Sequence, residues 1–276
     1  MNAKVMMLPH ALERVPEWAD AWRRTGTLVL LLDFDGTLAP IAALPELAEM
    51  PDTTRRALER LMSRPGVAVA VVSGRGLADV RERAAIPGIA YAGNHGMEIN
   101  VAGLEHVHAE AAAARPILER ALGELTDAIA PIPLAFVEDK GLTLSVHFRL
   151  SPRDLLHELH AIVHRVVEPL AGVHLTEGKQ VIEVRPDVDW NKGKAVLFLL
   201  EQLRPPAGAP VLYLGDDRTD EDAFRALLGW SGSGEGVVVA EHPSDDTAAT
   251  SYLREPAEVG ALFAALTKAG SLSSIF

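Results

Sequence analysis

Four short apolar runs, separated by segments with helical patterns, constrain the fold of this 276-residue chain more than any other feature. The runs cover residues 28–32, 67–72, 211–214 and 237–240. Strands that are buried on both faces of a parallel sheet have this continuous pattern. Between them, segments such as 52–63 and 76–84 have the spacing of helices. The alternation predicts an α/β fold with a doubly wound, mainly parallel sheet.

Polar clusters directly follow three of the four runs. They are Asp33-Phe34-Asp35, Ser73-Gly74-Arg75 and Gly215-Asp216-Asp217. In doubly wound sheets, ligands bind at the carboxyl ends of the strands, so these clusters are expected to converge on one edge. Two carboxylates one residue apart repel each other, and burial penalises each of them further. Such a pair is therefore expected where a metal cation neutralises it or where one carboxylate attacks a substrate.

The acidic residues at this edge suggest phosphoryl transfer. Asp33 is the candidate nucleophile, and Asp35 is the candidate general acid and base that protonates the leaving oxygen and later activates water. Asp216 is the candidate third ligand of a magnesium ion, with Asp217 as its rival or neighbour. Mg²⁺ prefers oxygen ligands, and two carboxylates plus one backbone carbonyl suit it. The alternative is that Asp33 and Asp35 only form a turn and cap a helix.

Two further residues complete the predicted catalytic set. The hydroxyl of Ser73 can donate a hydrogen bond to a phosphoryl oxygen, although its tripeptide is also compatible with an ordinary strand-to-helix turn. Lys192 lies at a predicted helix start, where a cation can hold nucleophile and phosphate together, and Lys194 is the alternative. Thr219 and the acids at 220–222 are explained as a helix N-terminus that carries favourable negative charge.

The middle of the chain has a different pattern, a helix followed by two strands, which occurs twice. It predicts a small antiparallel sheet backed by two helices, inserted as an α+β cap domain over residues 105–186 between core segments 1–104 and 187–276. The expected elements are a helix at 110–129, strands at 134–138 and 142–150, a second helix capped by Ser151 and running to about residue 170, and strands at 172–176 and 179–185 around a turn at Glu177-Gly178.

Side chains alternate along segment 142–149 of this insertion. Leu142, Leu144, Val146 and Phe148 share one face of the predicted strand, and the polar residues between them share the other. The apolar face is expected to cover the two helices. The residues alone leave two alternatives for the polar face: solvent contact, which is common in antiparallel sheets, or closure over the acidic site.

Composition excludes several classes of partner. The formal net charge of −12 argues against nucleic acid and anionic membranes. Cysteine is absent, which excludes disulfides and a thiol nucleophile. Residues 1–24 lack the apolar core of a signal peptide, and no stretch approaches the roughly 20 apolar residues that span a bilayer. We therefore expect a cytoplasmic protein.

The motifs resemble, in order, those of the haloacid dehalogenase (HAD) superfamily of aspartate-nucleophile phosphatases. The matching residues are Asp33 to Thr37, Ser73, Lys192 and Gly215-Asp216-Asp217. Further stretches resemble the trehalose-6-phosphate phosphatase family within it. These are Leu38-Ala39-Pro40-Ile41, Gly93-Asn94-His95-Gly96, Val146-His147-Phe148-Arg149, Glu183-Val184-Arg185-Pro186 and the acidic block from Gly215 to Phe224.

The resemblance implies a Mg²⁺-dependent phosphatase that hydrolyses trehalose 6-phosphate through an aspartyl-phosphate intermediate. It implies that Asp33 is the nucleophile, that Asp35 gives the metal its backbone carbonyl, and that Ser73 and Lys192 hold the phosphate. It also implies a substrate-binding set of Arg75, Asn94, His95, Glu138, Lys140, Arg149, Lys179 and Glu183. The alternatives are a phosphatase for another sugar phosphate, such as sucrose phosphate or glucosylglycerate phosphate, and a non-catalytic sensor. We expect the synthase that makes the substrate to be a separate chain.

Overall fold

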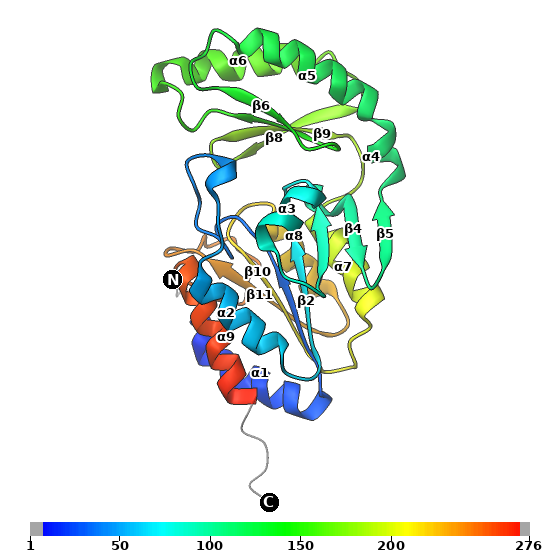
Figure 1. Cartoon of the computed structure of the whole chain (residues 1–276), viewed down its shortest axis with the longest axis vertical. Helices are drawn as coiled ribbons and strands as arrows, with labels where there is room; N and C mark the ends of the chain where they lie inside the picture. Colours follow the sequence, from blue (N-terminus) through cyan, green and yellow to red (C-terminus); the bar gives the residue numbers. More distant parts are fainter. Residues whose placement is uncertain (1–7, 271–276) are drawn as a thin grey trace, which may run out of the picture.

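The computed structural model describes residues 8–270 and has two sheets, one above the other (Figure 1). The larger sheet lies between helices on both faces, and the smaller sheet covers one of its edges with helices on the outer side. This arrangement confirms the predicted α/β core with an added α+β unit. Segments 1–7 and 271–276, which the predicted core domain includes, lie outside the described residues.

The larger sheet has eight strands. It is parallel from β12 to β3, and only β4 and β5 are antiparallel. In spatial order the strands are β12 (Ser251–Leu253), β11 (Ser233–Val239), β10 (Pro210–Gly215), β1 (Leu28–Leu32), β2 (Val67–Val72), β3 (Ala90–Gly93), β4 (Glu98–Val101) and β5 (Leu104–Val107). The four predicted apolar runs are the central strands, as their continuous apolar pattern requires.

Helices cover both faces of this sheet because its strands are apolar on both sides. Leu28, Leu30 and Leu32 face one core, whereas Val29 and Leu31 face the other. The first core is closed by α1 (Ala11–Thr25), α2 (Asp52–Met62), α3 (Leu77–Ala84) and α9 (Pro256–Gly270), and the second by α7 (Lys192–Leu203) and α8 (Asp220–Gly229). No helix within residues 8–270 is long and apolar enough to cross a bilayer.

The smaller sheet is antiparallel, with the order β6 (Phe136–Asp139), β7 (Leu144–His147), β9 (Val181–Pro186) and β8 (Val173–Gly178). Leu144, Val146 and Phe148 lie in a separate apolar core against α5 (Arg115–Ile129) and α6 (Leu156–Val167). The predicted alternation is therefore confirmed for these three residues, whereas Leu142 precedes β7 and packs with Met97 and Ala111 in a separate small cluster. The opposite face of the sheet points toward the carboxyl ends of the large parallel sheet (Figure 1).

Several predicted details in this region were wrong. The helix expected at 110–129 divides at Ala114 into α4 (Ala109–Ala113) and α5, because Pro116 cannot continue a helix from the preceding turn. Ser151 does not cap α6, which begins at Leu156 after a short 3₁₀ turn. The hairpin expected at Glu177-Gly178 turns instead at 179–180, where Gln180 takes a φ of 65°.

The predicted start of the insertion, residue 105, lies inside the large sheet and not between the two sheets. Strand β5 pairs with β4 in the large sheet, so residue 105 falls within a strand of that sheet. The two sheets are joined by two neighbouring connections, one through α4 and the other formed by the segment after β9 (Figure 1). The division at 105 and 186 stays a prediction.

Candidate active site

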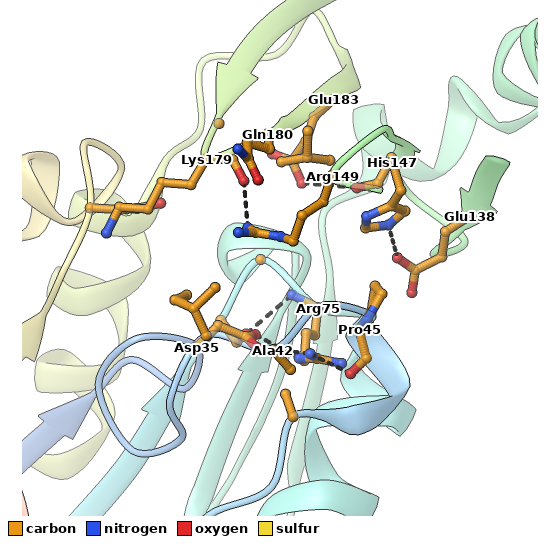
Figure 2. A pocket seen from close by; sticks show the side chains of 18 of the residues that line it. Asp35, Ala42, Pro45, Arg75, Glu138, His147, Arg149, Lys179, Gln180 and Glu183 are labelled. Carbon is orange, nitrogen blue, oxygen red and sulfur yellow. Dashed lines mark hydrogen bonds and ion pairs between the residues drawn. The ribbon is translucent and has the colours of Figure 1, made fainter. Parts of the chain in front are cut away.

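A large cavity lies between the carboxyl edge of the parallel sheet and the polar face of the smaller sheet. It encloses about 1180 Å³ of space, part of it open to solvent. Core residues form its floor, and residues from β6, β7 and the β8–β9 hairpin form its roof (Figure 2). Every predicted site residue except Asn94 lines this cavity. The clusters that follow β1, β2 and β10 therefore meet, as the topology of a parallel sheet requires.

Lys192, the first residue of α7, connects two buried carboxylates on the floor. Its Nζ donates to Asp33 Oδ1 at 2.8 Å and to Asp220 Oδ1 at 2.7 Å. All three side chains are almost inaccessible to solvent. Burial alone would lower the pKa of Lys192, but the charges of Asp220 and Asp33 outweigh burial and raise it. The lysine is thus held as a cation against the candidate nucleophile.

Asp220 is a central residue that the sequence analysis assigned only to a helix N-terminus. Its Oδ1 also accepts from the hydroxyl of Tyr213 at 2.6 Å, and its Oδ2 accepts from the backbone N–H groups of Asp216 and Asp217 at 2.9 and 3.0 Å. Both oxygens are therefore already used in holding Lys192 and the acidic loop. The N-cap residue Thr219 makes no side-chain cap hydrogen bond, and the turn before the helix is held by Asp217, whose Oδ1 accepts from the backbone N–H of Thr219 at 2.8 Å.

Asp33, Asp216 and Asp220 offer a cluster in which one carboxylate oxygen of each lies within 4.8 Å of the others. Carboxylate oxygens are the ligands that Mg²⁺ prefers, so the donor set fits a divalent cation. Because Asp220 already accepts four hydrogen bonds, Asp33 and Asp216 are the better candidates to bind a cation directly. Gly36, with a φ of 83°, makes room for this site, because a Cβ there would meet Asp216 Oδ2 at 2.0 Å.

The electrostatics of this cluster favour added positive charge. Burial raises the pKa of Asp33 well above its ordinary value, although Lys192 opposes the shift. Burial also raises the pKa of Asp216 to about 7, against the nearby charge of Lys179. Asp217 behaves differently, because Lys192 and two hydrogen bonds outweigh burial and lower its pKa to about 2. A divalent cation would bring Asp33 and Asp216 back toward the ionised form.

Asp35 is held by Arg75 in a two-pronged ion pair. Arg75 Nε donates to one carboxylate oxygen at 2.6 Å and Nη2 to the other at 2.8 Å (Figure 2). Its Nη1 donates to Asp79 at 2.7 Å. Arg75 also donates to the carbonyl of Pro45 at 2.9 Å. The arginine, predicted to bind substrate, therefore lines the cavity and binds both carboxylate oxygens of Asp35.

Of the two remaining catalytic candidates, Ser73 lines the cavity and Lys194 does not. Ser73 is buried at the cavity wall, and its hydroxyl accepts from the backbone N–H of Arg75 at 3.1 Å. Lys194, the alternative to Lys192, lies on the surface, where its Nζ pairs with Asp189 and does not reach the cavity.

The roof and floor meet in a buried network around Glu183. Its carboxylate accepts from Lys140 Nζ and lies 2.8 Å from Nε2 of His95. Lys140 Nζ also donates to the carbonyl of Gly74 at 2.9 Å. Burial lowers the pKa of His95 to about 4, despite the opposing charge of Glu183. The predicted sugar-binding residues Lys140 and Glu183 thus bind each other and join the two sheets.

The other predicted roof residues reach the cavity from β6, from the turn after β7 and from the β8–β9 hairpin. Glu138 lies 2.7 Å from Nε2 of His147, and Arg149 donates to the carbonyl of Lys179 at 2.7 Å (Figure 2). Lys179 Nζ contacts the carboxylate of Asp216 and donates to its carbonyl at 3.1 Å. A roof cation therefore lies directly on a candidate metal ligand.

Asn94 does not face the cavity. Its side chain is fully buried at the seam, where Nδ2 donates to the carbonyl of Lys140 at 2.8 Å and Oδ1 accepts from Thr143 at 2.7 Å. These bonds hold the first strand pair of the smaller sheet to the end of β3. The placement favours a structural role at the joint over direct contact with a ligand.

Comparisons with known proteins agree on one family. The family model described as "Trehalose-phosphatase" matches residues 31–257. A trehalose-phosphate phosphatase of Mycobacterium tuberculosis (strain H37Rv) is 42% identical over 237 residues, which cover 83% of this chain. A Mycobacterium avium protein of the same name is 40% identical over 261 residues, or 93% of this chain. The chain spans 59% and 66% of the lengths of these relatives.

A solved structure is similar as well. The C-terminal domain of the Candida albicans trehalose-6-phosphate phosphatase superposes with a TM-score of 0.78 and 26% identity, covering 97% of this chain and 99% of that domain.

Proposed function

The chain belongs to the trehalose-phosphatase family, and on this basis we propose that it hydrolyses trehalose 6-phosphate to trehalose and inorganic phosphate with Mg²⁺. The observation that carries the proposal is the buried Asp33 carboxylate. It lies against Lys192 and beside Asp216, at the floor of a cavity whose roof is polar. The smaller sheet and its helices act in this proposal as a cap domain over the catalytic core.

The first step uses Asp33 as the nucleophile. A carboxylate oxygen of Asp33 forms a bond to phosphorus as the bond between phosphorus and the sugar oxygen breaks, and Asp35 gives its proton to that oxygen. Trehalose leaves, and the phosphoryl group stays on Asp33. Because Arg75 donates to both carboxylate oxygens of Asp35 in the structure, proton donation to the leaving oxygen requires this ion pair to open.

The second step regenerates the enzyme. Asp35 takes a proton from water as the water oxygen attacks phosphorus, and the bond between phosphorus and Asp33 breaks to release inorganic phosphate. Lys192 neutralises Asp33 throughout, and the hydroxyl of Ser73 donates to a phosphoryl oxygen. Asp33, Asp216 and the backbone carbonyl of Asp35 would hold Mg²⁺, and the ion would supply charge neutralisation at the phosphate.

The roof selects the substrate. Glu138, Lys140, Arg149, Lys179 and Glu183 place both signs of charge above the phosphate site, which suits the hydroxyl groups of a sugar. Family membership favours trehalose as that sugar. Closure of the roof also excludes water from the attack of Asp33.

The experiment is phosphate release from a panel of sugar phosphates with Mg²⁺ present. The panel contains trehalose 6-phosphate, sucrose phosphate, glucosylglycerate phosphate and glucose 6-phosphate, with Asp33→Asn as the inactive control. We expect kcat/KM to be highest for trehalose 6-phosphate. A higher value for any other member would overturn the substrate assignment, and no release from any member would overturn the phosphatase itself.

A further inference from the structure

The cavity has an apolar end that the proposed chemistry does not use. Leu134, Phe136 and Leu150 line it from the roof, and Ile41 and the neighbouring segment to Pro45 line it from the floor. Phe136 is 37% exposed and Leu134 is 65% exposed, although both are large apolar residues. Phosphate and metal ions bind polar or charged groups, so they do not account for this apolar surface.

Phe136 belongs to a fixed unit. Its ring stacks on the ring of His147, with centroids 4.7 Å apart and an interplanar angle of 21°. His147 in turn bonds Glu138 through Nε2. An aromatic ring beside a fixed carboxylate suits a pyranose, which presents C–H groups on its faces and hydroxyls around its edge.

The sheet register places this unit relative to the phosphate end. Phe136 pairs with His147, and His147 pairs with Val181, which closely follows Lys179 in the hairpin above Asp216. Phe136 therefore lies two inter-strand spacings, roughly 10 Å, from the hairpin strand. A group in contact with Phe136 sits beyond the part of the substrate that lies over the acidic cluster.

We propose that Phe136, backed by His147, is a specificity-determining residue that packs against the sugar ring that does not carry the phosphate, with the 41–45 segment as the opposite wall. The inference rests on the proposed function, because it takes the substrate to be a disaccharide phosphate. It assigns the second ring to the apolar end and the phosphate to Asp33. A monosaccharide phosphate would leave this end empty.

The test compares Phe136→Ala with wild type for three quantities. These are the KM for trehalose 6-phosphate and the inhibition constants of the two products, trehalose and inorganic phosphate. We expect the KM and the trehalose constant to rise roughly tenfold, the size of a lost aromatic contact, with kcat nearly unchanged. The phosphate constant should not change, since phosphate occupies only the Asp33 end.

Two further variants serve as controls. Phe136→Tyr keeps the ring and should retain the wild-type KM. Leu228→Ala removes a 57% exposed apolar side chain from α8, outside the cavity, and should change none of the three quantities.

Two results would overturn the inference while the proposed function stands. Equal changes in all three constants would mean that Phe136 only helps the roof to close, and no change in any would mean that the second ring does not touch it. Wild-type protein that does not hydrolyse trehalose 6-phosphate would instead remove the proposed function, and the inference with it.

Discussion

The floor and the roof of the cavity differ in how far their charged and aromatic side chains are exposed to solvent. On the floor, Asp33, Lys192 and Asp220 are buried, and each is held by hydrogen bonds with buried backbone or side-chain partners. On the roof, Lys179 is 53% exposed and Phe136 is 37% exposed. A preorganised floor suits a reaction that must stabilise developing charge without rearrangement. A more exposed roof suits a surface that closes on a ligand and releases it.

The largest expected effect comes from Asp33, the proposed nucleophile on the floor. Asp33→Asn keeps the size of the side chain but removes the attacking oxygen, so turnover should fall roughly 10³-fold or more. Phosphate release measures this loss, and circular dichroism checks that the variant folds. Near-normal turnover would end the assignment of Asp33 and, with it, the view that the floor supplies the chemistry.

Lys192 should matter for stability as well as rate. Lys192→Met leaves Asp33 and Asp220 buried without their cation, so the free energy of unfolding without metal should fall by about 3–5 kcal/mol. Urea denaturation in the presence of a chelator measures it. Lys194→Met is the matched control two residues away, and its surface position predicts a change below about 0.5 kcal/mol. Equal effects of the two variants would contradict the contrast between buried and exposed charge.

The contact between floor and roof around His95 should make the free energy of unfolding depend on pH. The pKa of His95 is about 4 in the folded protein, below the 6.5 of an ordinary histidine, because burial disfavours the cation. The unfolded chain therefore binds the proton first, and stability falls as pH drops below 6.5, by roughly 2 kcal/mol at pH 5. Glu183, Lys140 and Arg185 are the charged groups that act on the imidazole.

His95→Gln should lose this part of the pH slope. The comparison uses urea denaturation of both proteins between pH 7 and pH 5. This range lies above the pKa of Glu183, which is lowered well below its ordinary value. Burial opposes that shift, and the charges of Lys140 and His95 outweigh burial. Parallel curves for the two proteins would show that His95 does not titrate between the folded and unfolded states in this range.

The smallest effect concerns the roof cation that contacts Asp216. Lys179→Met removes a competitor for Mg²⁺, so the ion should bind about two- to fivefold more tightly, as expected for an ion pair with a half-exposed lysine, worth up to about 1 kcal/mol. Calorimetric titration with Mg²⁺ alone measures the affinity. Lys194→Met should leave it unchanged. Weaker binding of Mg²⁺ to Lys179→Met would show that the lysine supports the metal site and does not compete for it.

How far the sequence predicts this molecule depends on the range of the interactions. Parallel strands and the polar clusters at their ends are local patterns, so Asp33, Ser73 and Asp216 could be placed at one edge before any coordinates. Asp220 was not found, because its sequence context is that of an ordinary helix start, and its partners Tyr213 and Lys192 come together only in the fold.

The roof was less predictable for the same reason. Alternation along β7 predicted its apolar and polar faces, but not that Thr143 would turn inward to bind Asn94. Phe136 offered no signal, since one aromatic residue at a strand start is compatible with any surface. Its place in the cavity follows from the cross-strand register with His147, which the sequence does not state.

The central claim is that the fixed floor performs covalent chemistry through Asp33. The most direct measurement is mass spectrometry of protein that is acid-quenched during turnover of trehalose 6-phosphate with Mg²⁺, then digested. The account predicts one added phosphoryl group on the peptide that contains Asp33, and none in Asp33→Asn. A phosphoryl group on a different residue, or rapid turnover with no phosphorylated peptide at any quench time, would contradict it.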